Sequence, residues 1–158
     1  MNKMTVAVMA AVALAMSAVA EDFVSKAKDF DPSPDWKTVD GALVAERQGA
    51  SVSAVLPIAA GGFDVWAEVL VGSKVKIDVN GSVYVPKAEG TAGEFVWEKL
   101  GAIGGVPGGY TAVTVTPTAE GKSAFRQVLL TDDLNWKAPV PAKPAAPKCD
   151  GKCCPLAK

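Results

Sequence analysis

Residues 62–71 read Gly-Phe-Asp-Val-Trp-Ala-Glu-Val-Leu-Val, and this stretch decides the fold. Every second residue from Phe63 to Val69 is apolar, whereas Asp64, Trp66 and Glu68 stand between them. Because successive side chains of a β-strand point to opposite faces, the stretch predicts a strand with one buried face and one face toward solvent. Trp66 departs from this pattern, since it places a large aromatic ring between two carboxylates on the solvent face.

The neighbouring segments carry the same alternation. After a hinge at Gly72-Ser73, residues 74–80 alternate Val75, Ile77 and Val79 with polar residues, and Asn80-Gly81 is the strongest hairpin signal in the chain. No segment between residues 21 and 136 repeats with the period of a helix. The sequence therefore predicts an all-β antiparallel sandwich or jelly roll of about eight short strands. The expected strands are residues 42–46, 51–56, 62–71, 74–80, 82–86, 94–100, 110–116 and 123–131.

The segments between these strands are rich in turn-forming residues. Prolines and aspartates within residues 21–41 predict an irregular approach, with Phe23, Phe30 or Trp36 packed on the sandwich. Gln48-Gly49 predicts a turn between the first two strands. The glycine-rich run 101–109 lacks the endings of known phosphate-binding loops, and we expect a flexible connection there.

The first twenty residues have the features of a secretory signal peptide. A short cationic start is followed by an apolar run from Met4 to Met16, and Ala18 and Ala20 fit an A-x-A cleavage site. The apolar run is shorter than the roughly 20 residues that span a bilayer. We therefore expect a mature protein that begins at Glu21, has no membrane span, and is secreted or periplasmic.

Composition excludes several classes of function. The chain has 16 basic and 17 acidic residues, and loss of Lys3 with the leader makes the balance slightly more acidic, which argues against nucleic acid as a partner. The chain contains no histidine, which excludes Ser-His-Asp and Cys-His catalysis and histidine-ligated metals. No cofactor is expected.

The C-terminal region changes composition abruptly. Residues 137–148 are rich in proline, alanine and lysine and predict an extended spacer after a sandwich domain of residues 21–136. Residues 149–158 contain all three cysteines, Cys149, Cys153 and Cys154, and are expected to form a disordered tail. These thiols could form a disulfide within the tail, which leaves one cysteine for an intermolecular disulfide, or they could bind a soft metal such as Cu(I) or Zn(II). Oxidation to a disulfide is the simpler fate of thiols in an exported protein.

Five segments in order resemble the galactose-binding-like jelly roll of carbohydrate-binding modules appended to secreted glycoside hydrolases. The resemblance covers residues 40–136, and its segments are residues 60–69, 75–81, 95–101, 108–111 and 128–133. It implies a sandwich fold and glycan binding through exposed aromatic residues. Two positions depart from the family pattern: Glu68 replaces an arginine, and Arg126-Gln127 replace an acid that binds calcium in some members, which argues against a calcium site here.

Candidate binding residues follow from what a sugar needs, namely an aromatic surface for the pyranose ring and polar groups for its hydroxyls. We select Trp66, Trp97, Tyr84, Asp64 and Glu68 as ligand-binding residues. The wider set includes Tyr110, Asp78 and Asn80, together with Trp36 and Trp136, which flank the domain and are expected to anchor its ends. The alternative is that these aromatic rings only cover the sandwich.

The sequence thus predicts a non-catalytic, exported carbohydrate-binding module. Acid pairs such as Asp64 with Glu68, or Asp132 with Asp133, have no active-site motif around them, so we do not expect an enzyme. Two alternatives depend on the tail: a periplasmic thiol or metal-binding protein, and a structural subunit joined to others by a disulfide.

Overall fold

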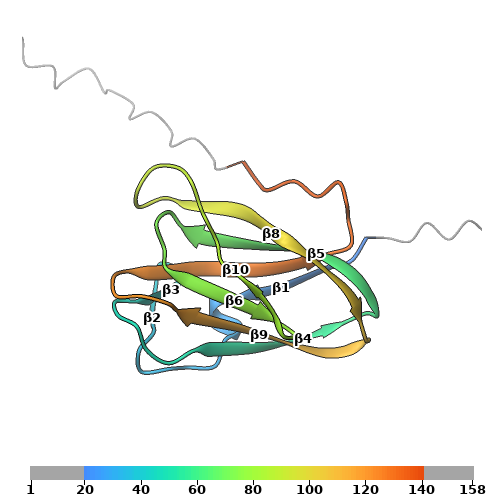
Figure 1. The fold of residues 1–158 in the computed structure, drawn as a ribbon, viewed down its shortest axis with the longest axis horizontal. Coiled ribbons are helices and arrows are strands. Elements are labelled where there is room, and N and C mark those ends of the chain that lie inside the picture. The colour runs from blue at the N-terminus through green and yellow to red at the C-terminus, as the bar shows by residue number, and fades with distance from the viewer. Residues whose placement is uncertain (1–19, 141–158) are drawn as a thin grey trace, which may run out of the picture.

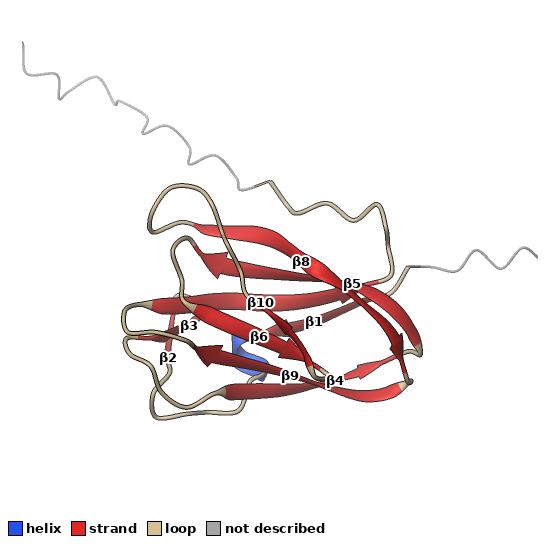
Figure 2. Cartoon of the chain, viewed as in Figure 1, coloured by secondary structure: helices blue, strands red, loops and turns tan. Residues whose placement is uncertain are grey.

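The computed structural model describes residues 20–140, which fold into two stacked antiparallel sheets (Figures 1 and 2). This confirms the predicted all-β sandwich, with ten strands instead of about eight. The elements are β1 (Asp22–Lys26), the short 3-10 helix η1 (Ala27–Asp29), β2 (Lys37–Val39), β3 (Ala42–Ala45), β4 (Val52–Ile58), β5 (Gly61–Leu70), β6 (Val75–Val79), β7 (Ser82–Tyr84), β8 (Phe95–Val106), β9 (Gly109–Pro117) and β10 (Ser123–Thr131).

The two sheets differ in size. The first contains six strands in the order β2-β3-β10-β5-β8, with β1 beside the second half of β10. The second contains four strands in the order β4-β9-β6-β7. Every strand pair is antiparallel, and strands that follow each other in sequence repeatedly change sheet, as in a jelly roll.

The core lies between the sheets and follows the predicted alternation. Val65, Ala67 and Val69 of β5 are fully buried, as are Ile77 and Val79 of β6. The approach segment also contributes: the rings of Phe30 and Trp36 both pack edge-on against Phe125, at centroid distances of 4.9 and 5.5 Å. The expectation that aromatic residues of this segment anchor it to the sandwich is therefore confirmed.

The predicted hairpin at Asn80-Gly81 is present. Both residues have positive φ, +50° and +85°, as a type I′ turn requires. The Asp78 carboxylate accepts a hydrogen bond from the Gly81 amide at 2.8 Å and closes the turn. The turn joins β6 to β7 in the second sheet.

The structure corrects one expectation about the connections and adds two observations on strand pairing that the sequence did not address. The approach segment is not wholly irregular, because β1 pairs with β10 along its whole length. The strands on either side of Gln48-Gly49 do not form a pair, since β3 pairs with β2 and β10 whereas β4 pairs with β9. In the same way, the hinge Gly72-Ser73 carries the chain from the first sheet to the second.

The glycine-rich run is also not a flexible connection. Strand β8 continues through this run to Val106. Glycines can take part in the sheet because its hydrogen bonds join backbone N–H and C=O groups and require no side chain. Gly101 sits beside a bulge in the β5–β8 pairing with φ +154°, and a Cβ atom there would lie 3.0 Å from the Tyr84 ring. A glycine at position 101 therefore lets β8 pass close to that ring.

The predicted leader and the cysteine tail lie outside the described residues. Among residues 20–140, no helix is long and apolar enough to cross a membrane. The same residues contain no group of three or more metal-binding side chains close enough to hold an ion. The predictions for Cys149, Cys153 and Cys154 remain predictions.

Candidate functional site

The outer face of the first sheet carries most of the predicted binding residues. Strand β5 presents Asp64, Trp66 and Glu68 on this face, and the register with β8 sets Trp97 opposite Glu68 and Lys99 opposite Trp66. This register also resolves which face of β8 is buried, which the sequence left ambiguous: Trp97 and Lys99 point outward, while Val96 opposes the core residue Val69. Two tryptophans and three charged side chains therefore share one surface.

A C-terminal arm, residues 132–140, folds back over this surface. Figure 1 shows it in orange, turning at the end of β10 and running back past β8. The Trp136 ring packs against Trp66 in a tilted arrangement at 4.7 Å and edge-on against Trp97 at 5.1 Å between centroids. In the part of the chain that the structure describes, no hydrogen bond joins residues 134–140 to either sheet. The arm is therefore held mainly by its tryptophan.

Trp66 and Asp64 are poorly available to a ligand, for different reasons. Trp66 is only partly exposed, and its Nε1 is buried with no hydrogen-bond partner among the described residues. The Asp64 carboxylate is mostly buried and forms an ion pair with Lys99 at 2.5 Å. The Lys99 ammonium also lies 5.9 Å from the centre of the Trp66 ring. Trp66 is thus occupied by the arm, and Asp64 is occupied by Lys99.

Glu68 is the centre of a polar network. Its two carboxylate oxygens accept hydrogen bonds from Arg126 Nη1 at 3.3 Å and from Gln127 Nε2 at 2.8 Å. A bulge in β10 makes this possible, because it turns two consecutive residues toward the same partner on β5. The Arg126 guanidinium lies 4.2 Å from the centre of the Phe95 ring, which fixes its position further.

The arm and this network enclose a groove of about 710 Å³, which we call the arm groove. Its volume falls within the range of roughly 300–1,000 Å³ that is usual for ligand sites. The lining residues come from three strands and the arm, and they are Glu68, Phe95, Val96, Trp97, Arg126, Gln127, Ala138, Pro139 and Val140. Of the five residues selected from the sequence, Trp97 and Glu68 line this groove.

Tyr84 lies apart from the arm groove. It belongs to β7 in the second sheet, and its hydroxyl donates a hydrogen bond to the Ala102 carbonyl at 3.1 Å. Burial of the ring raises the pKa of the Tyr84 hydroxyl above its usual value. The Tyr84 side chain therefore links the two sheets near Gly101.

The wider candidates are also dispersed. Trp36 is buried and donates a hydrogen bond from Nε1 to the Ala50 carbonyl at 2.8 Å. Asp78 and Asn80 form the β6–β7 turn. Tyr110 is 83% exposed on the outer face of the second sheet, opposite Pro57, and is the most exposed of the chain's tyrosines and tryptophans. No second aromatic ring accompanies Tyr110 there.

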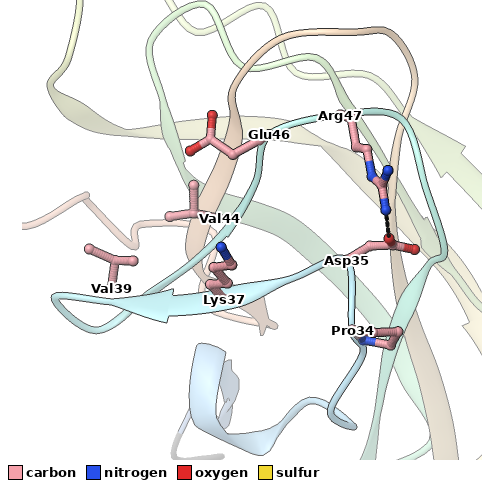
Figure 3. A pocket seen from close by; sticks show the side chains of 7 residues that line it. All are labelled: Pro34, Asp35, Lys37, Val39, Val44, Glu46 and Arg47. Atoms are coloured by element: carbon pink, nitrogen blue, oxygen red, sulfur yellow. Dashed lines mark hydrogen bonds and ion pairs between the residues drawn. The ribbon is translucent and has the colours of Figure 1, made fainter.

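A second hollow, of about 250 Å³, lies over β2 and β3 (Figure 3). Asp35 accepts hydrogen bonds from Arg47 at 3.1 Å and from the Ala50 amide at 3.0 Å at one side of it. The Ala50 amide, followed by Arg47, lowers the pKa of the Asp35 carboxyl. No aromatic side chain lines this hollow, so it offers a pyranose ring no stacking surface.

Arg126 and Gln127 are the polar groove residues that the sequence did not select. In the sequence, Glu68 and Arg126 are two separate departures from a family pattern. In the structure they form a single ion pair across β5 and β10. The sequence indicated this ion pair in one way: an acid replaces the family's base at position 68, and a base replaces the family's acid at position 126.

Comparison with known proteins gives the fold a context. No protein-family profile matches the sequence, and no curated protein is similar to it. The CBM36-1 domain of a multidomain xylanase from the hindgut metagenome of Trinervitermes trinervoides superposes with a TM-score of 0.56 at 9% identity, over 76% of this chain and all of that domain.

Two larger proteins contain a similar part. The GH26-CBM35 β-(1,4)-mannanase of Podospora anserina matches with a TM-score of 0.54 at 12% identity, over 76% of this chain and 28% of the mannanase. The insecticidal crystal protein Cry2Aa matches with a TM-score of 0.52 at 12% identity, over 69% of this chain and 21% of that protein. This chain thus spans less than a third of either protein. At these identities the likeness concerns the fold, and the described part of the chain has the β-jelly-roll fold of carbohydrate-binding modules.

Proposed function

We propose that this protein is an exported, non-catalytic carbohydrate-binding module that holds a glycan in the arm groove. The observation that carries the proposal is that Trp97 lies in one groove with a carboxylate, an amide and a guanidinium, from Glu68, Gln127 and Arg126. An aromatic ring accommodates the apolar face of a pyranose, and the polar groups bond its hydroxyls. Similarity in fold to carbohydrate-binding modules supports the same function.

The chemistry of the groove favours binding over hydrolysis. Glycoside hydrolases place two carboxyl groups roughly 5 to 10 Å apart on either side of the bond that breaks. Glu68 is the one carboxylate among the residues that line the arm groove, and both of its oxygens already accept hydrogen bonds. Asp64, the nearest acid along β5, is engaged by Lys99. We therefore assign no catalytic residue.

Export is proposed from the leader at residues 1–20. A local contact adds support for cleavage between Ala20 and Glu21: the Glu21 backbone nitrogen lies 2.8 Å from Asp132 Oδ1. Cleavage there would turn this nitrogen into a charged ammonium beside a carboxylate, which is a favourable pair. Mass spectrometry of the protein recovered from the periplasm or the culture medium tests this cleavage. A measured mass that includes residues 1–20 contradicts it.

The binding proposal is tested by retention on insoluble polysaccharides and by a glycan array. We expect the folded protein to be retained and the Trp97→Ala variant to bind about tenfold more weakly, a change of about 1.4 kcal/mol. Tyr110→Ala is the matched control, because it removes an exposed ring from the other sheet. It should bind as the wild type does.

Trp97→Ala also removes a contact to Trp136, so a second variant separates binding from loss of the arm. Gln127→Ala removes a groove amide without touching either tryptophan, and it should weaken retention while leaving the near-ultraviolet circular dichroism unchanged. If no glycan retains the folded wild type, the proposed function is wrong. If Tyr110→Ala abolishes retention and Trp97→Ala does not, the site lies on the second sheet.

A further inference from the structure

The arm groove continues beyond Gln127 across the first sheet. A hollow of about 320 Å³ is lined by Lys26, Asp40, Gly41 and by Glu68, Arg126 and Gln127. The last three residues also line the arm groove. Because the two hollows share these side chains, they adjoin each other, and we call the two together the track, which extends from Trp97 to the turn between β2 and β3.

The track crosses the strands instead of following them. It starts on β8, passes over Glu68 of β5 and Gln127 of β10, and reaches Lys26, which pairs with Gln127 from β1. Neighbouring strands lie about 4.8 Å apart, so three steps from β8 to β1 span about 15 Å. A track of this length exceeds a single sugar ring and suits several linked rings.

The charges along the track cancel. Lys26 and Arg126 are balanced by Asp40 and Glu68, and Arg126 is already paired with Glu68 at 3.3 Å. Recognition of an acidic polysaccharide needs an excess of cationic groups facing its carboxylates or sulfates. The residues that line the track provide no such excess.

We propose that the track binds a chain segment of a neutral polysaccharide, which lies across the strands with one ring on Trp97 and later rings over Gln127 toward Lys26. This inference rests on the proposed function and adds the ligand class and the direction in which the chain lies. The aromatic end anchors one ring by stacking, and the balanced polar groups bond hydroxyls along the rest of the chain.

Affinity electrophoresis and calorimetry test the two parts of the inference separately. Galactomannan, xylan and mixed-linkage β-glucan serve as neutral polymers, and polygalacturonate and alginate as acidic ones. We expect at least one neutral polymer to retard the protein and neither acidic polymer to do so. For oligosaccharides of the bound polymer, the association constant should rise about tenfold or more from the disaccharide to the tetrasaccharide and then level off.

Lys26→Ala removes the far end of the track. We expect it to lower the association constant of the tetrasaccharide three- to fivefold, a change on the order of 1 kcal/mol, and to leave that of the disaccharide unchanged. Lys28→Ala is the matched control, because Lys28 is an exposed lysine of η1 outside the track. Affinity that does not depend on oligosaccharide length overturns the track and leaves the binding function intact. Retardation by acidic polymers alone overturns the neutral class. Failure to bind any glycan overturns the proposed function itself.

Discussion

Trp136 should hold the arm on the sheet by a measurable and limited amount. Its ring makes two aromatic contacts, to Trp66 at 4.7 Å and to Trp97 at 5.1 Å. Such pairs contribute about 0.5–1.5 kcal/mol each, so Trp136→Ala should lower the free energy of unfolding by about 1–3 kcal/mol. Urea unfolding followed by far-ultraviolet circular dichroism gives this value, and the near-ultraviolet signal of the packed tryptophans should fall in native buffer.

Leu134→Ala is the control for this experiment. Leu134 lies in the same arm and is 85% exposed, so its removal should change stability by less than about 0.5 kcal/mol. A loss below about 0.5 kcal/mol for Trp136→Ala, with an unchanged near-ultraviolet spectrum, would refute the role of the ring. A loss above about 4 kcal/mol would show that the arm belongs to the cooperative core.

Four further substitutions test the fold. Ser25→Ala removes a buried hydroxyl that has no partner among the described residues, so it should be neutral or stabilising. Ser73→Ala removes the hydroxyl that accepts a hydrogen bond from the Ala124 amide at 2.8 Å, so it should lower the free energy of unfolding in urea by about 1–3 kcal/mol. Equal losses of stability in the two variants would contradict this contrast. Gly81→Ala introduces a side chain at φ +85° and should cost about 1–2 kcal/mol, and a neutral result would mean that the hairpin rearranges. The folded pKa of Asp35 lies below its usual value of 3.8, so its contribution is complete above that pH and is lost as the pH falls toward the folded pKa. Thermal unfolding from about pH 5 to about pH 3 should therefore depend less on pH in Asp35→Asn than in the wild type.

The interior of the sandwich could be predicted because its signals are local. Val75, Ile77 and Val79 alternate with polar residues, and all three are at most 1% exposed in the structure. The hairpin at Asn80-Gly81 depends on the conformation of two adjacent residues. By contrast, β1 contains one fully buried residue, Ser25, and its partner β10 lies about a hundred residues away along the chain, so neither periodicity nor a turn indicated it.

The site was predicted in part for a similar reason. Outward positions on β5 and β8 follow from alternation, which is why Trp97 and Glu68 were found. Arg126 and Gln127 face Glu68 together only because of a bulge, which breaks the two-residue period. Trp136 was expected to anchor an end of the domain, but its position over Trp66 depends on the path of the arm, which no local pattern encodes.

The place of β10 in the first sheet has a consequence for how the chain acquires its structure. Among the strands of residues 20–140, this one is synthesised last, yet β1, β3 and β5 all pair with it. A nascent polypeptide that stops before Ser123 lacks the element on which three earlier strands assemble. Contacts so distant in sequence slow folding, because loop closure must precede them. Ribosome-bound chains in which β10 has not yet emerged should therefore remain sensitive to protease.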